Sequence, residues 1–354
     1  MGGARGTTTV QPERSTPSAS VQAKTVTLLP MLVVTRTPLP TYMPSITPIP
    51  TETLGPTPTA LGGGYGQIAF ASDRTGAPQI FIMNADGSDP RQVTNMVDGA
   101  CQPAWSPNGL RLVFISPCPK RQEQYPGAIL YVINADGSGV SPLAAGDGGN
   151  FDPAWSPDGT RIAFTSLRDG SAQIYILRLA DNTVSRLTEA SSDIKFPDWS
   201  SQPTWSSSGT QIVYTAHSRL TNSKQIWVMS DTGQGPKFLI PRGDIYWDFL
   251  PTWSPDGNTI LFSETSGDQE LGWLMTFNIQ TAKVDHLRVQ AYGTHDDYSS
   301  DGTWVVYESL DIQDPGRQDY DIYRIQADGT GTILLLTNDL SMEFDPAWRP
   351  IAKP

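Results

Sequence analysis

The sequence contains few of the residues from which catalytic and metal centres are usually built. Its 354 residues include only three histidines and two cysteines, and the histidines lack the spacing of metal ligands. It contains no Gly-x-Ser-x-Gly segment of a serine hydrolase and no glycine-rich phosphate loop ending in lysine. Its Asp-Gly pairs lack the alternating oxygen ligands of a calcium loop, so we interpret them as turns. We therefore expect no catalytic centre, no cofactor and no metal site.

Positive charge is also scarce. The chain carries 24 Lys and Arg against 36 Asp and Glu, a formal net charge of −12. Binding to nucleic acid or to an anionic membrane requires a basic surface, so this balance argues against both functions. The longest apolar stretch near the N-terminus, 28–34, is interrupted by Pro30 and is far shorter than the roughly 20 residues that span a bilayer. We expect no nucleic-acid binding and no direct membrane insertion, and no export signal is visible.

Proline and glycine, in contrast, are abundant, and the proline is concentrated near the N-terminus. Between residues 35 and 60, fifteen of 26 residues are Thr or Pro, and a triple glycine follows at 62–64. Such a segment stays extended and solvated and builds no core. We predict a disordered stalk or linker over 1–64 and one domain over 65–352. Because stalks of this composition are typical of surface and secreted proteins, we expect an extracytoplasmic location; the alternative is a cytoplasmic protein with a linker.

A short motif recurs through the predicted domain. At 103–109 it reads Pro-Ala-Trp-Ser-Pro-Asn-Gly, and its anchor aromatic residue returns every 45 to 50 residues. Repetition at such a period indicates a repeat architecture. The anchors are Trp105, Trp155, Trp205, Trp253, Tyr298 and Trp348.

The residues after each anchor also repeat. Short β-branched and aromatic runs, such as 162–164 and 174–176, alternate with tight Asp-Gly turns, a pattern that predicts antiparallel strands joined by hairpins. Six units of four strands predict an all-β, six-bladed propeller in which the anchors pack between blades. The first unit, beginning at 68–70, lacks an innermost strand, and the last motif, 346–348, is an isolated strand. We therefore predict that pairing of the N- and C-terminal strands closes the ring.

These repeats resemble the WD40-like (PD40) repeats of the TolB propeller superfamily. The best matches lie at 80–87, 152–159 and 162–166, and the resemblance covers 67–350. It implies a six-bladed fold and, by analogy with TolB, a periplasmic partner-binding role. TolB also carries an N-terminal α/β domain, whose place is taken here by the stalk, so a role in the Tol–Pal system is left open.

The two cysteines lie close to one another in the predicted topology. Cys101 precedes one innermost strand, and Cys118 follows the next strand of the same hairpin. The two loops emerge on the same rim, so a disulfide is geometrically reasonable, and it would favour an oxidising compartment. The alternative is two free thiols.

The rim that carries the longer, more variable loops is the expected place for ligand binding. Polar residues cluster there in the predicted topology, with an aromatic and acidic patch at Tyr246, Trp247 and Asp248. These side chains either form a polar funnel for a peptide, a sugar or a cation, or they bond only loop amides and channel waters. The residues three positions before the anchors are Gln102, Asp152, Gln202, Leu250, His295 and Asp345.

We expect a monomeric, non-enzymatic binding or scaffold protein that recognises a protein, peptide or polysaccharide through this rim. One alternative is a lyase- or glycosidase-like enzyme that uses His295 and neighbouring carboxylates at the channel mouth, which requires Asp152, His295 and Asp345 to share one ligand. The other alternative is the regulatory propeller of a peptidase system.

Overall fold

The computed structural model describes residues 66–191, 197–218, 222–240, 246–267, 271–292, 294–310 and 319–351. All regular elements in these residues are β-strands. The predicted stalk over 1–64 lies outside the described residues.

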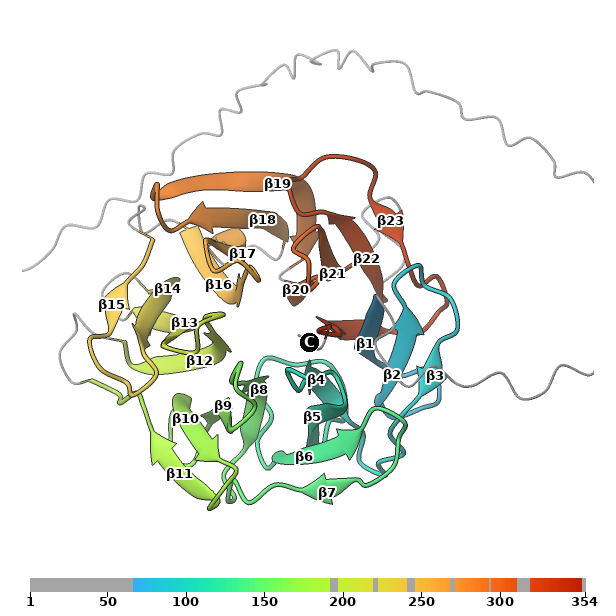
Figure 1. Ribbon diagram of the computed structural model, residues 1–354, viewed down its shortest axis with the longest axis horizontal. Helices are drawn as coiled ribbons and strands as arrows, with labels where there is room; N and C mark the ends of the chain where they lie inside the picture. The colour runs from blue at the N-terminus through green and yellow to red at the C-terminus, as the bar shows by residue number, and fades with distance from the viewer. Residues whose placement is uncertain are drawn as a thin grey trace, which may run out of the picture. The chain divides into compact units, whose positions relative to one another are not determined.

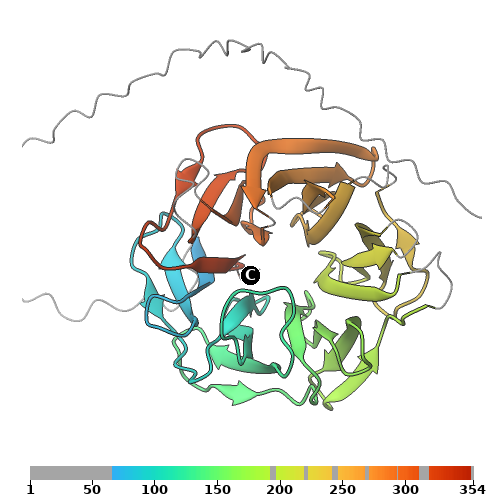
Figure 2. The same ribbon diagram turned by 180° about the vertical axis from the view of Figure 1, so that it is seen from behind.

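Six four-stranded antiparallel sheets surround a central axis, which confirms the predicted six-bladed propeller (Figures 1 and 2). From the innermost strand outwards, blade 1 consists of β24 (Glu343–Trp348), β1 (Gln67–Ser72), β2 (Gln79–Asn84) and β3 (Arg91–Gln92), and blade 2 consists of β4 (Cys101–Trp105), β5 (Arg111–Ser116), β6 (Ile129–Asn134) and β7 (Ser141–Pro142). Blade 3 consists of β8 (Asn150–Trp155), β9 (Arg161–Ser166), β10 (Gln173–Arg178) and β11 (Thr183–Arg186), and blade 4 consists of β12 (Trp199–Trp205), β13 (Gln211–Ser218), β14 (Ser223–Ser230) and β15 (Lys237–Phe238). Blade 5 consists of β16 (Tyr246–Trp253), β17 (Thr259–Ser266), β18 (Leu271–Asn278) and β19 (Lys283–Tyr292), and blade 6 consists of β20 (Asp296–Tyr298), β21 (Trp304–Leu310), β22 (Tyr320–Gln326) and β23 (Leu334–Leu335).

Blade 1 joins the two ends of the described chain. In Figure 1 the dark red C-terminal strand lies beside the blue β1, and β24 pairs antiparallel with β1 through Ile68 opposite Trp348 and Ala69 opposite Ala347. This pairing supplies the innermost strand that the first repeat lacks. It confirms the predicted closure of the ring, in which β1 is not left as an open edge.

The hydrophobic core lies between the blades. Second strands are buried almost throughout, as in β9, where every residue after Arg161 is buried, because neighbouring blades cover both faces of each sheet. The anchors add contacts between blades, as expected: the Trp105 indole Nε1 donates to the Ala347 carbonyl at 3.1 Å, and Trp205 donates in the same way to Ala154. Each blade is therefore stabilised mainly by its neighbours.

The Asp-Gly pairs form tight turns at the blade ends. In the β16–β17 turn, the Asp256 carboxylate accepts the Ser254 hydroxyl at 2.5 Å and the Asn258 amide at 3.0 Å. These bonds hold the pKa of Asp256 below its usual value. Gly257 follows with a φ of 73°, a conformation that glycine adopts without a steric penalty. These carboxylates therefore stabilise the turns.

Candidate functional site in the central channel

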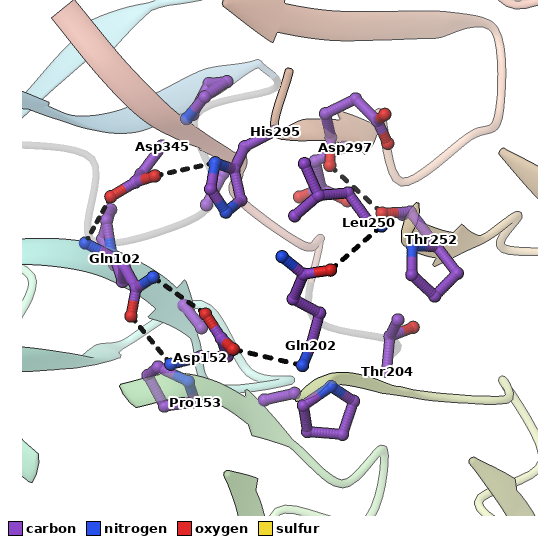
Figure 3. Close-up of a pocket in the computed structure, with 18 residues that line it drawn as sticks. Gln102, Asp152, Pro153, Gln202, Thr204, Leu250, Thr252, His295, Asp297 and Asp345 are labelled. Atoms are coloured by element: carbon purple, nitrogen blue, oxygen red, sulfur yellow. Dashed lines mark hydrogen bonds and ion pairs between the residues drawn. The ribbon is translucent and has the colours of Figure 1, made fainter. Parts of the chain in front are cut away.

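The innermost strands surround a cavity of about 220 Å³ on the propeller axis (Figure 3). Its wall is built from the three residues that precede each anchor. All six positions singled out in the sequence are therefore brought together: Gln102, Asp152, Gln202, Leu250, His295 and Asp345.

Most of these residues lie at a β-bulge. The register between the first two strands shifts in blade 2 between Cys101 and Ala104, and in blade 4 between Ser201 and Thr204. The residue at the bulge has a positive φ, 53° for Gln102 and 56° for Gln202. A bulge takes the backbone amide out of the sheet ladder, so that this amide needs another acceptor.

That acceptor is the side chain at the same position in the preceding blade. The Asp345 carboxylate accepts the Gln102 amide at 3.0 Å, and Gln102 Oε1 accepts the Asp152 amide at 2.7 Å. Asp152 accepts the Gln202 amide at 3.1 Å, and Gln202 accepts the Leu250 amide at 3.2 Å. The dashed lines in Figure 3 follow these links around the channel. These side chains have the structural role of joining successive blades through their bulges.

The series is interrupted at blade 6. The Leu250 side chain has no acceptor for the amide of the next blade. Glu308 of β21 serves as the acceptor in its place: it accepts the Asp345 amide at 2.6 Å and, through a longer contact of 3.4 Å, the His295 amide. Glu308 stands ten residues after its anchor, where blades 3 and 4 have Thr165 and Thr215. A longer, charged side chain thus replaces a threonine next to the channel.

Glu308 belongs to a network of four charged side chains. Arg121 Nη2 lies 2.6 Å from Glu308 Oε1, and the Arg121 guanidinium stacks over the Tyr320 ring with 4.2 Å to its centroid. His295 Nδ1 lies 3.0 Å from Asp345 Oδ1 and 3.5 Å from Glu308 Oε1. With Arg121 and His295 positive and both carboxylates negative, the network is balanced in charge.

The pKa values reflect this balance. Burial opposes ionisation of Glu308, but the Arg121 charge and the bond to His295 hold its pKa at about 2. Burial also opposes protonation of His295, but Asp345 and Glu308 raise its pKa well above its usual value. Both groups are therefore charged at neutral pH.

Donor atoms of His295, Glu308 and Asp345 lie within 4.8 Å of one another, a spacing compatible with metal ligands. A divalent ion there would have to displace the guanidinium of Arg121 from Glu308 and remove the proton of His295. Since each of these groups already has a charged partner, the arrangement favours an internal ion network over a metal centre.

Two carboxylates that the sequence analysis did not single out also line the cavity. Asp296 is 8% exposed, and neither of its carboxylate oxygens has a hydrogen-bond partner among the described residues. Asp297 accepts the Tyr298 amide at 2.8 Å and the Trp348 amide at 2.7 Å. Burial raises the pKa of Asp296 well above its usual value and the pKa of Asp297 to about 7. A signal existed in the sequence, because the other copies of the motif have Pro followed by Ala or Thr at these positions.

Residues 91–291 match the family model of the TolB β-propeller domain, PD40. This match spans more than half of the 354 residues. The chain belongs to this family.

Solved structures show the same fold. TolB from Acinetobacter baumannii is 22% identical with a TM-score of 0.67, covering 82% of this chain and 69% of that protein. A putative TolB from Agrobacterium tumefaciens is 20% identical with a TM-score of 0.58, covering 82% and 100%. An oligogalacturonate lyase in complex with manganese is 12% identical with a TM-score of 0.51, covering 76% and 73%. A comparison with curated proteins gave no match.

In this PD40 propeller, a strap formed by residues 117–128 between β5 and β6 crosses the rim. A disulfide joins Cys101 to Cys118 and fixes the beginning of the strap to β4. From blade 2 the strap reaches blade 6 through Arg121 and blade 4 through the ion pair of Glu123 with Lys224. Blades 4 and 6 flank the blade opposite to blade 2, so the strap extends across the axis of the ring.

The aromatic and acidic patch lies in the PD40 propeller at the beginning of β16, ahead of the residues that line the cavity. None of Tyr246, Trp247 and Asp248 is part of the cavity wall. They form the first residues of β16, which runs beyond its bulge and pairs with the far end of β17. Trp247 instead packs near Lys224, whose Nζ lies 5.7 Å from the ring centroid, while Asp248 is buried and Tyr246 is 37% exposed.

The described part of the chain contains no helix with the length and apolar character needed to cross a bilayer.

Proposed function

We propose that this PD40 propeller is a non-enzymatic, extracytoplasmic binding protein that holds a segment of a protein or polymer ligand at its central channel. The observation that carries the proposal is that the polar side chains of the cavity wall have two different roles. Most of its polar side chains join the blades, whereas the buried carboxyl group of Asp296 has no hydrogen-bond partner within the described part of the chain. A buried polar group without a partner is costly, and a ligand that supplies a hydrogen bond offsets that cost.

The same contacts disfavour an enzyme. Acid–base catalysis at the mouth needs Asp152, His295 and Asp345 to act on one ligand. The Asp152 oxygens are engaged by the Gln102 side chain at 2.8 Å and the Thr165 hydroxyl at 2.9 Å, as well as by a backbone amide. His295 is held as a cation between two carboxylates and therefore offers no free base. The lyase of similar fold is in complex with manganese, whereas in the His295, Glu308 and Asp345 cluster of this chain Glu308 is already paired with Arg121.

The extracytoplasmic location is supported by the disulfide between Cys101 and Cys118, since such bonds persist in oxidising compartments. Mass mapping of the protein after alkylation in cells of its source tests this part. Recovery of the bridged peptide pair supports export, and recovery of two alkylated thiols contradicts it.

Binding at the channel is tested by selecting displayed peptides against the whole chain and measuring their affinity for channel-filled variants. Ala154 lines the cavity, so Ala154→Trp removes space there, and Thr204→Phe does so from the next blade. Ala180→Trp, in the exposed β10–β11 turn, is the matched control. We expect selected peptides to bind the parent and the control equally and to lose at least tenfold in affinity for whichever channel variant retains the parent melting temperature.

Unchanged binding to both channel variants contradicts a channel site. The enzyme alternative is tested by absorbance of unsaturated products from oligogalacturonides, and measurable turnover that is lost on His295→Gln would overturn the non-enzymatic proposal.

A further inference from the structure

We propose that the cavity accepts the cationic head of a lysine or arginine side chain from the bound segment, with Asp296 and Asp297 as its acceptors. This inference rests on the proposed function and specifies the chemistry of the ligand. It concerns a part of the wall in which one blade differs from the other five.

The first argument is the replacement of the repeat pattern at cavity-lining positions. Blades 1 to 5 have proline two positions before the anchor and Ala or Thr one position before it. Blade 6 has Asp296 and Asp297 there. Proline and alanine need no partner in the wall of a rigid ring, whereas two adjacent carboxyl groups repel one another and lose hydration. Asp297 stabilises the ring by accepting the Trp348 amide of blade 1 at 2.7 Å, but the Asp296 carboxyl group makes no such contact among the described residues, so we attribute Asp296 to a ligand.

The second argument is the unpartnered state of Asp296. Asp296 is part of the cavity wall with 8% of the residue exposed, and its two carboxylate oxygens are buried and lack hydrogen-bond partners among the described residues. Burying an unpaired carboxyl group costs several kcal/mol unless it is protonated or a donor reaches it. The Thr252 hydroxyl of blade 5 donates to the Asp296 backbone carbonyl at 3.2 Å, and its proximity opposes part of the burial effect on the Asp296 pKa.

The third argument is the charge that remains after internal pairing. His295 faces Asp345 and Glu308, and Glu308 also holds Arg121. The charges of these four groups cancel. Asp296, Asp297 and Asp152 remain as acidic groups of the wall without a cationic partner of their own among the described residues. A ligand of positive charge complements that surplus, and an anionic ligand does not.

The volume of the cavity suits a single side chain of the ligand. A cavity of about 220 Å³ is below the roughly 300–1,000 Å³ of pockets that enclose drug-sized ligands. It has room for one ammonium or guanidinium head with a few waters. The rest of the ligand then lies outside the cavity.

Binding of a cation is also coupled to protons. Burial raises the pKa of Asp297 to about 7, so this group carries a proton in slightly acidic solution, and burial also raises the pKa of Asp296 well above its usual value. The other ionisable groups around the cavity are Asp152, His295, Asp345 and Glu308, of which the last three already have charged partners. A bound cation stabilises the ionised carboxylates and expels these protons. Affinity therefore increases with pH, by up to about tenfold per unit for each proton released.

The test compares two synthetic peptides, acetyl-Gly-Gly-Arg-Gly-Gly-amide and the same peptide with citrulline, which keeps the shape of arginine without its charge. Titration calorimetry with the whole chain at pH 6 and pH 8 measures both. We expect the arginine peptide to bind at least tenfold more tightly than the citrulline peptide at pH 8, with a smaller ratio at pH 6. Asp296→Asn is expected to reduce the ratio to less than twofold.

Asp181→Asn, at the exposed β10–β11 turn of blade 3, is the control. It is expected to keep the ratio of arginine-peptide to citrulline-peptide affinity that the parent shows. Equal affinity for the two peptides, or a ratio retained in Asp296→Asn, overturns the inference. Should that variant fail to fold, carboxyl NMR of the parent protein decides the matter: the arginine peptide is expected to lower the titration midpoints of Asp296 and Asp297 by at least one pH unit, and unchanged midpoints overturn the inference.

Failure of this inference is distinguishable from failure of the proposed function. If selected peptides lose affinity for Ala154→Trp but need no basic residue and bind Asp296→Asn normally, the channel function stands and the cationic specificity is wrong. If the arginine peptide binds parent and Ala154→Trp equally, the site is elsewhere and both proposals are wrong.

Discussion

In blades 1 to 4, a glutamine or an aspartate stands three residues before the anchor, and its side chain joins the blade to the next one. Its side-chain oxygen accepts the amide that the bulge of the next blade releases, as Gln102 does for Asp152. Of the two interpretations left open by the sequence, the structural one describes these contacts. A side chain that has the same role in successive repeats belongs first to the architecture, and Asp296, which replaces a proline of the motif and has no such role, is the better candidate for function.

Removing one of these links has a predictable cost. Gln102→Ala deprives the part-buried Asp152 amide of its acceptor and the Asp152 carboxylate of a donor. We expect a loss of about 2 kcal/mol in the free energy of unfolding, measured by urea denaturation. Gln234→Ala, in the exposed β14–β15 turn, is the matched control and is expected to change it by less than about 0.5 kcal/mol. Equal effects of the two substitutions would contradict the structural role of the ring.

Asp296 gives a pH-dependent prediction. Its pKa is higher in the folded protein than the usual 3.8, so the folded state binds more protons than the unfolded state between these two values. Its contribution to stability therefore decreases as pH rises through that interval. Asp296→Asn removes the effect, and we expect the variant to melt several degrees above the parent at pH 8 but close to it at pH 5. A difference in melting temperature that is the same at both pH values would exclude a raised pKa at this residue.

At the scale of elements, the strap is the feature that departs most from a plain propeller. It begins at the disulfide, and its ion pairs reach blades 4 and 6. These contacts connect sheets that are not neighbours in the ring. A ligand that approaches from this rim therefore meets the strap before it meets the channel wall.

The disulfide is expected to contribute to stability by restricting the unfolded chain. It closes a segment of 17 residues, for which loop-closure entropy predicts about 3 kcal/mol. The double variant Cys101→Ser with Cys118→Ser is therefore expected to unfold at lower urea concentration, and the parent treated with reductant is expected to match it. If reductant leaves the parent midpoint unchanged while the thiols become titratable, the bridge has no stabilising role.

At the scale of the whole molecule, stability depends on closure of the ring. β24 provides the innermost strand of blade 1, and Ala347 accepts the anchor indole of blade 2. A chain without β24 exposes the edge of β1, where other chains can pair. Cooperation between neighbouring blades is lost at the same place.

We accordingly expect a chain that ends at residue 342 to unfold less cooperatively and to aggregate, as measured by denaturation and light scattering. A chain that ends at residue 351, which keeps β24, is the control and is expected to behave like the parent. A synthetic peptide of residues 343–351 is expected to restore part of the lost stability in trans. Parent-like unfolding of the shorter chain would show that the ring does not depend on this strand.

The sequence by itself determined the fold, because each repeat carries its own anchor, turns and strands, and these local preferences recur at a nearly constant spacing. It also identified the six ring positions, since their distance from the anchor is the same in every blade. It placed Tyr246, Trp247 and Asp248 at the channel mouth, and in the structure they begin β16 and are not among the residues that line the cavity. Spacing alone does not tell how far a strand continues beyond its bulge.

Only the tertiary structure decided what surrounds the channel in blade 6. Arg121 and Glu308 are 187 residues apart, and no local pattern relates a loop of blade 2 to a strand of blade 6. Closure of the ring brings these two residues together. Their charges are balanced in a network of ion pairs with His295 and Asp345. Whether a carboxylate is paired or left without a partner depends on such long-range contacts, and that difference separates Asp296 from the acidic residues of the turns.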